Sequence, residues 1–222
     1  MKTVRKFFVL LTILVILLSG FTFASATNRN TLSVSDQFIQ LCNDMYTNES
    51  AYVILNKNGA DITDSYYENT AEWYQNGDFT SISLYYRNHV GRFIKYESST
   101  RGSYQTVTTG IPFMIDVDIS IASPYELFFT LYVRFTYNIN TGKISSATAS
   151  LTLDNDGSGY LVSPEINNLS TSATISPDKY SITVSCQFYV NTVLSIPLGD
   201  YGEIEREELT GPYSYSYRAY GE

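Results

Sequence analysis

Apolar and polar residues alternate along several stretches of the chain, most clearly in its second half. One run places an apolar residue at every second position over eleven residues: Leu127, Phe129, Leu131, Val133, Phe135 and Tyr137. A second run does the same from residue 180 onward: Tyr180, Ile182, Val184, Cys186, Phe188 and Val190. A period of two predicts strands with one face toward a core and the other toward water.

Shorter runs of the same kind are separated by Gly, Asn, Asp and Pro residues, which favour turns. Together they predict an all-β protein of about ten to twelve strands, arranged as an antiparallel β-sandwich or a curved meander. Residues 35–47 are the exception, because Phe38, Leu41, Cys42 and Met45 follow a helical spacing behind a cap at Ser35 or Asp36. We therefore expect one short N-terminal helix, and no helical crossovers that would make a parallel sheet.

The N-terminus has the features of a secretory signal peptide. Three basic residues precede an apolar run over residues 7–18, and Ala24-Ser25-Ala26 supplies the small residues at a cleavage site. Residues 1–26 are thus predicted to be removed before Thr27, which leaves a secreted or cell-surface protein without a membrane span. The alternative is an uncleaved anchor, with the apolar run extended to Phe23.

We expect residues 27–222 to form a single secreted β domain, because no linker-like composition interrupts them. An alternative division at Pro112 gives a helix plus β-meander over residues 27–111 and a β-sandwich over residues 112–222. The two cysteines, Cys42 and Cys186, are far apart in sequence and outside any Cys-rich framework. Two buried thiols are therefore favoured over a disulfide, although an exported protein could form one.

The charge of the chain is acidic. The formal net charge is −8, and removing the three basic residues of the signal peptide, which has no acidic ones, leaves −11. Such a surface argues against nucleic acid and against anionic membrane surfaces as partners. It is compatible with a preference for cations or with solubility alone.

One segment suggests a cation site. Residues 154–165 read DNDGSGYLVSPE, and they offer oxygen ligands at the spacing of a calcium loop: Asp154, Asp156, Ser158, Tyr160 through its carbonyl, and Glu165. The spacing resembles an EF-hand loop, and this resemblance implies Ca²⁺ as a cofactor. The preceding residues 147–153 alternate as a strand, so the EF-hand helices are not expected. The alternative interpretation is a polar turn whose acidic residues face water.

An aromatic cluster surrounds the single Trp of the chain and comprises Tyr66, Tyr67, Trp73 and Tyr74. Flat aromatic faces next to amide and carboxylate side chains are typical of sugar-binding platforms, so we predict a glycan or a surface protein as partner. Packing in a protein core accounts for the same residues.

Evidence for catalysis is sparse. The only histidine, His89, is expected in an exposed turn, and no Gly-x-Ser-x-Gly motif accompanies it. Asp116 and Asp118 share one face of a predicted strand, so a secreted glycan-active hydrolase with paired carboxylates is an alternative. A self-associating surface protein is a third hypothesis, based on the tyrosines of residues 213–217. A non-catalytic binding module is favoured.

Overall fold

The computed structural model describes residues 34–97, 102–120, 125–155, 162–197 and 203–220. Within these ranges the chain is mostly β, with two antiparallel sheets and three α-helices. The expected all-β, sandwich-like character is therefore confirmed. Calcium loop residues Asp156, Ser158 and Tyr160 lie outside the described ranges, as does the predicted signal peptide.

The first sheet contains five strands whose spatial order equals their order in the chain. They are β1 (Tyr52–Asn56), β2 (Val90–Tyr96), β3 (Tyr104–Val117), β4 (Tyr125–Asn138) and β5 (Ile144–Leu153). The alternation predicted for β4 is confirmed, since Leu127, Phe129 and Leu131 are almost fully buried. The residues between them belong to the opposite face, where Thr130 is also buried.

The second sheet contains β6 (Val162–Ile175), β7 (Ser181–Pro197) and β8 (Glu203–Tyr220), with β7 in the centre. Its inner face packs against the first sheet in one continuous apolar core. The rings of Phe129 and Phe188 lie 4.9 Å apart across this interface, and Phe113 stacks on Tyr215 at 4.2 Å. Burial of large aromatic rings holds the two sheets together.

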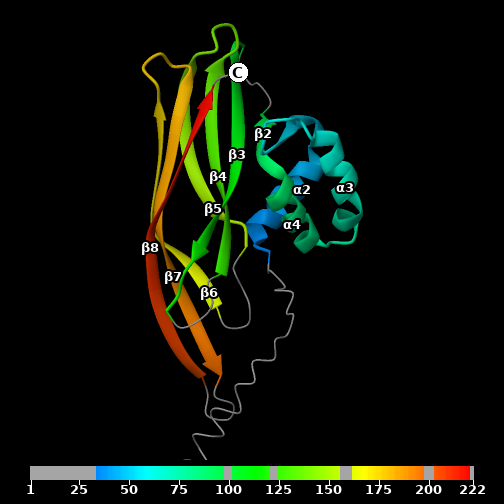
Figure 1. Ribbon diagram of the computed structural model, residues 1–222. Helices are drawn as coiled ribbons and strands as arrows, with labels where there is room; N and C mark the ends of the chain where they lie inside the picture. Colours follow the sequence, from blue (N-terminus) through cyan, green and yellow to red (C-terminus); the bar gives the residue numbers. More distant parts are fainter. Residues whose placement is uncertain (1–33, 98–101, 121–124, 156–161, 198–202, 221–222) are drawn as a thin grey trace, which may run out of the picture. The chain divides into compact units, whose positions relative to one another are not determined.

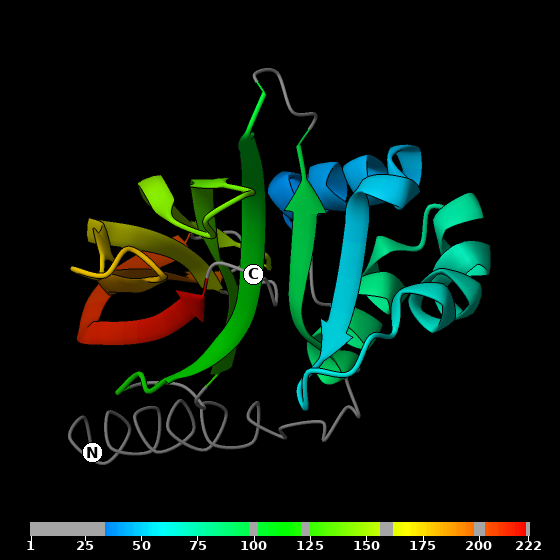
Figure 2. The ribbon, with the colours of Figure 1, turned by 90° about the horizontal axis from the view of Figure 1, so that it is seen from above.

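Helices α2 (Asp36–Thr47), α3 (Thr63–Gln75) and α4 (Phe79–His89) lie on the other side of the five-stranded sheet (Figure 1). The view from above shows the helices and β6–β8 on opposite sides of β3 (Figure 2). Helix α2 is the predicted one, and the Ser35 hydroxyl caps it by accepting a hydrogen bond of 3.2 Å from the Phe38 amide. Phe38, Met45, Tyr66 and other apolar residues form a second core beneath the helices.

Two details of the predicted fold are wrong. The described residues form eight strands instead of ten to twelve, because individual strands run through residues that suggested turns. Strand β3 continues through Pro112, and β8 continues through Gly211-Pro212. The expectation of a single helix is also wrong, since α3 and α4 occupy most of residues 63–89.

Both cysteines are free and buried, as predicted. Cys42 lies in the core beneath the helices, and Cys186 lies between the two sheets. Their positions on opposite sides of the five-stranded sheet separate them. In the part of the chain that the structure describes, no helix has the length and apolar character needed to cross a membrane.

Candidate functional site

The described part of the predicted calcium loop places its two carboxylates in different surroundings. Asp154 directly follows β5 and is only 3 % exposed, whereas Glu165 is exposed on β6. The Asp154 side chain accepts hydrogen bonds from the hydroxyls of Thr130, at 2.6 Å, and Thr152, at 3.1 Å. Asp154 is therefore already engaged within the protein, and calcium binding by this loop stays a prediction.

Burial changes the acidity of Asp154. Removal of its carboxylate from water raises the pKa to about 7, and the hydrogen bonds from Thr130 and Thr152 only partly oppose this. The backbone of Asp154 is also fixed, because its carbonyl accepts from the Ser35 amide and its amide donates to the Phe128 carbonyl. The carboxyl can thus change its protonation near neutral pH in a rigid, dry environment.

Other polar side chains approach Asp154 from different elements. Tyr86 of α4 and Tyr132 of β4 are close enough for the Asp154 charge to raise their pKa values, in addition to the larger effect of burial. Among the described residues, no hydrogen-bond partner reaches the hydroxyls of Tyr66 and Tyr86. Asp154, Tyr66 and Tyr86 are buried and Tyr132 is partly buried, so a substrate cannot reach the carboxyl in this conformation.

The predicted aromatic cluster lies on α3, where its rings contact other rings. Tyr66 is completely buried, and the Tyr67 hydroxyl donates to the Met45 carbonyl at 3.1 Å. Tyr74 stacks on Tyr46 at 3.8 Å with nearly parallel planes, which covers one face of its ring. Trp73, half-buried, contacts Tyr85 with ring centroids 6.1 Å apart. The cluster therefore contributes largely to packing of the helical layer.

Asp116 and Asp118, the carboxylates of the hydrolase alternative, lie at an exposed end of the five-stranded sheet. Asp116 and Asp118 are both exposed, but only Asp116 lies on a strand, because β3 ends at Val117. The pairing of β3 with β4 places Asp116 directly opposite Glu126, a neighbour that the sequence alone did not indicate. The Glu126 carboxylate also forms an ion pair with Arg87, at 3.4 Å. Two carboxylates therefore lie side by side there.

His89 is exposed, as predicted, but it is the last residue of α4 and not part of a turn between strands. Its ring stacks on that of Tyr85 at 4.1 Å. One of its ring nitrogens, Nδ1, lies 3.0 Å from the Tyr85 carbonyl oxygen. These contacts hold the imidazole against its own helix.

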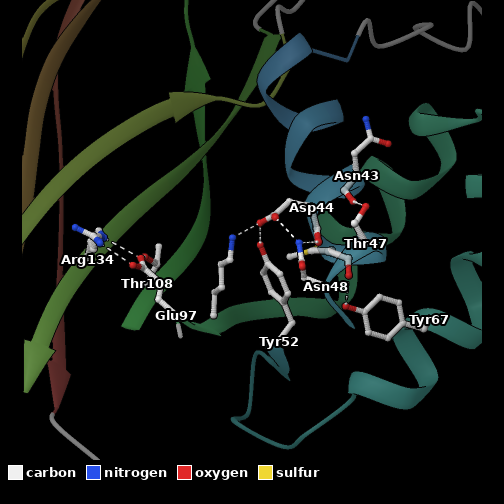
Figure 3. Close-up of polar contacts among 11 residues, drawn as sticks. Asn43, Asp44, Thr47, Asn48, Tyr52, Tyr67, Glu97, Thr108 and Arg134 are labelled. Carbon is white, nitrogen blue, oxygen red and sulfur yellow. Dashed lines mark hydrogen bonds and ion pairs between the residues drawn. The ribbon is translucent and has the colours of Figure 1, made fainter. Parts of the chain in front are cut away.

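A polar network links α2 to the sheet (Figure 3). The Asp44 carboxylate accepts hydrogen bonds from the Tyr52 hydroxyl, from Lys95 Nζ at 2.5 Å and from Asn48 Nδ2 at 2.9 Å. Burial alone would raise the pKa of Asp44, but the hydrogen bonds from Lys95 and Tyr52 outweigh it and lower the pKa. This ion pair anchors the helix to β1 and β2.

A second ion pair lies farther along the same face of the sheet. The guanidinium of Arg134 donates to both carboxylate oxygens of Glu97, at 2.8 and 2.6 Å, and the Thr108 hydroxyl donates at 3.0 Å (Figure 3). These bonds, chiefly those from Arg134, lower the pKa of Glu97. The Arg134 side chain is 61 % exposed, so solvent weakens the pair.

An open hollow of about 330 Å³ lies on the three-stranded sheet. Val184, Cys186 and Phe188 of β7 point into the core, so the residues between them point outward. Outward-pointing hydroxyl and amide side chains from all three strands line the hollow: Ser170, Ser172, Ser185, Gln187, Ser214 and Ser216. Cys186 and Tyr215 complete the lining.

The lining residues come from segments far apart in the sequence. Strand pairing places Ser185 opposite both Ser172 and Ser216, and Gln187 opposite both Ser170 and Ser214. The Ser172 and Ser185 hydroxyls are hydrogen-bonded to each other at 2.8 Å. The hollow is therefore a continuous polar surface without a charged side chain in its lining.

The chain matches no protein-family model, no curated protein and no solved structure. In the ranges that the structure describes, no three His, Cys, Asp or Glu side chains gather in an arrangement that could hold a metal ion.

The sequence pattern alone does not indicate the hollow. Serines at every second position, as at Ser170 and Ser172 or at Ser214 and Ser216, mark polar strand faces. Such a pattern identifies the exposed face of one strand, but it does not reveal which strands lie side by side. The pairing of β6, β7 and β8 is what assembles the site.

Proposed function

We propose that this protein is a secreted or cell-surface binding module that binds a glycan in the hollow on β6, β7 and β8. The observation that carries the proposal is the uncharged lining of serine hydroxyls and the Gln187 amide. Sugar hydroxyls both donate and accept hydrogen bonds, as do serine hydroxyls and the two ends of a glutamine amide. The lining thus matches a neutral, hydroxyl-rich ligand.

An aromatic ring next to the hollow adds to this match. Tyr189 lies two residues beyond Gln187 on β7, on the same outward face, and is half-buried. Ligand sites commonly combine an apolar contact surface with a few polar groups that fix orientation. Tyr189 would supply the apolar contact to a sugar ring, and the hydroxyls would supply the orientation.

Binding without catalysis is favoured because the lining contains no His, Asp or Glu. Glycoside hydrolysis ordinarily needs two carboxyl groups on either side of the scissile bond. A serine needs a neighbouring base to act as a nucleophile. Neither requirement is met by the residues that line the hollow.

The test is isothermal titration of the chain from Thr27 onward with cellohexaose, maltohexaose and chitohexaose. Gln187→Ala and Ser185→Ala should each weaken binding about 2- to 10-fold, the effect of losing one or two hydrogen bonds. Thr183→Ala is the matched control, because Thr183 is exposed on the same face of β7 and does not line the hollow. Equal affinity in all variants, or no binding of these sugars, would refute the proposal.

Hydrolysis is the second candidate, and the opposed carboxylates of Asp116 and Glu126 favour it. Its test is the release of reducing sugar from the same oligosaccharides. Release that is abolished by Asp116→Asn and unaffected by Gln187→Ala would favour the carboxylate pair over the hollow. No release by the unmodified protein would eliminate this candidate for these sugars.

A further inference from the structure

Strand β8 forms one edge of the three-stranded sheet. It is 18 residues long, it pairs with β7 on one side, and within the described residues no strand pairs with its other side. An unpaired edge presents backbone N–H and C=O groups that can pair with another strand. The two halves of β8 differ in how accessible and how charged this edge is.

The first half of β8 is acidic and is contacted by the segment that follows β3. The Ser120 amide donates to the Glu208 carboxylate at 3.0 Å, and Arg206 Nη2 donates to the Ser120 hydroxyl at 3.2 Å. Glu205 and Glu207 add negative charge there. A second strand with the same charges would be repelled from this half.

The second half carries an uncharged sequence, Tyr213-Ser214-Tyr215-Ser216-Tyr217, which reads the same in both directions. When two copies of this segment pair antiparallel about a two-fold axis through Tyr215, serine lies opposite serine and tyrosine lies opposite tyrosine, and such cross-strand pairs are favourable. We infer that two copies of this chain pair through β8, with the two Tyr215 residues opposite each other at the axis.

In this register the residues on both faces of β8 have favourable partners. Ser214 of one copy lies opposite Ser216 of the other on the outward face, and Tyr213 lies opposite Tyr217 on the inward face. Aromatic pairs and serine or threonine pairs across strands are favourable. No two glutamates of β8 lie opposite each other. The glutamates of one copy lie beyond Tyr220, the last residue of β8, in the other copy. A register centred on Arg206 would instead place Glu205 opposite Glu207.

Pairing in this way joins the two three-stranded sheets into one sheet of six strands. The hollows of the two copies then lie on one continuous face, with Ser214 and Ser216 of both copies at its centre. This inference concerns the oligomeric state and is independent of the ligand proposed for the hollow. Its tests measure mass and cross-linking, so they remain valid if no glycan binds.

Sedimentation equilibrium over a concentration series should show a monomer–dimer equilibrium for the chain from Thr27 onward. Ser214→Glu/Ser216→Glu places like charges opposite each other twice, whereas Ser214→Lys/Ser216→Glu places opposite charges there. Both positions are exposed, so both variants should fold, which circular dichroism will verify. The dimer dissociation constant should rise about 2- to 30-fold in the first variant and fall by a similar factor in the second.

Cysteine cross-linking tests the register. Residues directly opposite each other in antiparallel strands have Cα atoms about 4.5–5.5 Å apart, within the range of a disulfide. Ser214→Cys/Ser216→Cys should therefore form a disulfide-linked dimer on mild oxidation. Either single variant should form far less, because its two cysteines would lie on the diagonal, about 7–8 Å apart. A strictly monomeric protein at ~0.5 mM, or equal cross-linking of single and double variants, overturns the inference.

Discussion

The Thr130 hydroxyl donates a hydrogen bond of 2.6 Å to the carboxylate of Asp154, and both residues are buried beneath the helices. The contact joins β4 to the residue that directly follows β5, next to the first turn of α2. An ionised carboxylate is costly in such surroundings, which is why burial raises the pKa of Asp154 to about 7. The folded protein therefore holds a proton that the unfolded chain loses in weak acid.

This linkage predicts that Asp154 makes the protein less stable as the pH rises. Its contribution is fully present below the unfolded pKa of 3.8, declines as the pH approaches 7, and is lost above that. The free energy of unfolding should fall by up to ~4 kcal/mol over this window, since one pKa unit corresponds to about 1.4 kcal/mol. Urea unfolding at pH 4.5, 6 and 8 measures it.

Asp154→Asn should flatten this pH dependence, because the amide keeps the size and polarity of the side chain without titrating. Asp178→Asn is a suitable control, since Asp178 is exposed and its carboxylate accepts hydrogen bonds from Ser176 and Tyr180, which are close to it in the sequence. If Asp154→Asn retains the full decline between pH 4.5 and 8, another group is responsible for it.

Asp44→Asn should destabilise the protein by about 1–2 kcal/mol at pH 7, because Lys95 loses its ion pair and Tyr52 loses a charged acceptor. The pKa of Asp44 is lowered in the folded state, so its contribution is present above the unfolded pKa and is lost as the pH falls through the folded value. The difference between variant and parent in urea unfolding should therefore shrink near pH 3.

Glu97→Gln is the comparison for Asp44→Asn. Its partner Arg134 is much more exposed than Lys95, so Glu97→Gln should lower the free energy of unfolding by less than about 1 kcal/mol. An equal loss for both variants would show that burial does not distinguish the two ion pairs.

Gly110→Ala should destabilise the protein by about 1–3 kcal/mol through overpacking. Gly110 lies opposite Phe93 in the β2–β3 pair, and a Cβ atom at this position would lie 2.2 Å from Cε1 of the Phe93 ring. Phe93 is 1 % exposed, so its ring has little room to move. Thermal and urea unfolding would measure the loss.

The double variant Gly110→Ala/Phe93→Leu identifies the cause of that loss. The smaller leucine removes the clash, so the double variant should lose less stability than the two single variants added together. Simple additivity would mean that the alanine is tolerated without displacing Phe93.

The calcium prediction can be tested without disturbing the core. If the loop binds with a dissociation constant near ~0.1 mM, then ~5 mM Ca²⁺ should add about 2.3 kcal/mol relative to EDTA and raise the melting temperature by roughly 5–9 °C. Glu165→Gln should abolish the shift, whereas Glu68→Gln on α3 should not. An Asp154 variant is unsuitable because Asp154 is part of the core. No shift in the unmodified protein would leave the segment a polar turn.

The sheets were predictable where one face of a strand is buried and the other is wet. In β7, Ile182, Val184 and Cys186 are buried and the residues between them are not. The alternation of apolar and polar residues in the sequence therefore predicted this strand. The number of strands was not predictable in the same way. A proline in an edge strand or beside a bulge suggests a turn, yet β8 accommodates Pro212 next to its bulge with β7.

Helices α3 and α4 were missed because their buried positions are filled by residues common in strands. Tyr66 and Thr70 have helical spacing and are both fully buried, but tyrosine and threonine favour β structure. The buried Thr70 hydroxyl donates a hydrogen bond to the Tyr66 carbonyl at 2.7 Å and is hydrogen-bonded to the Tyr46 hydroxyl at 2.6 Å. A hydrophobic pattern that counts threonine as polar does not detect this helix face.

The sequence did not predict the burial of Asp154, for a different reason. An aspartate just after a strand and before Gly and Ser residues has the local sequence of a solvent-facing loop ligand. Only the three-dimensional arrangement brings Thr130, from a strand more than twenty residues earlier, to its carboxylate. The hollow on β6–β8 depends on long-range pairing in the same way.

In both sheets each strand lies beside its neighbours in the chain, and this has a consequence for how the protein forms. A chain delivered from its N-terminus can add one hairpin at a time, so that β2 to β5 close successively without waiting for distant partners. Each such closure joins strands that are adjacent in the chain, so its loop-closure entropy cost is smaller than that of pairing distant strands. The second sheet can then pack against a five-stranded sheet that has already formed.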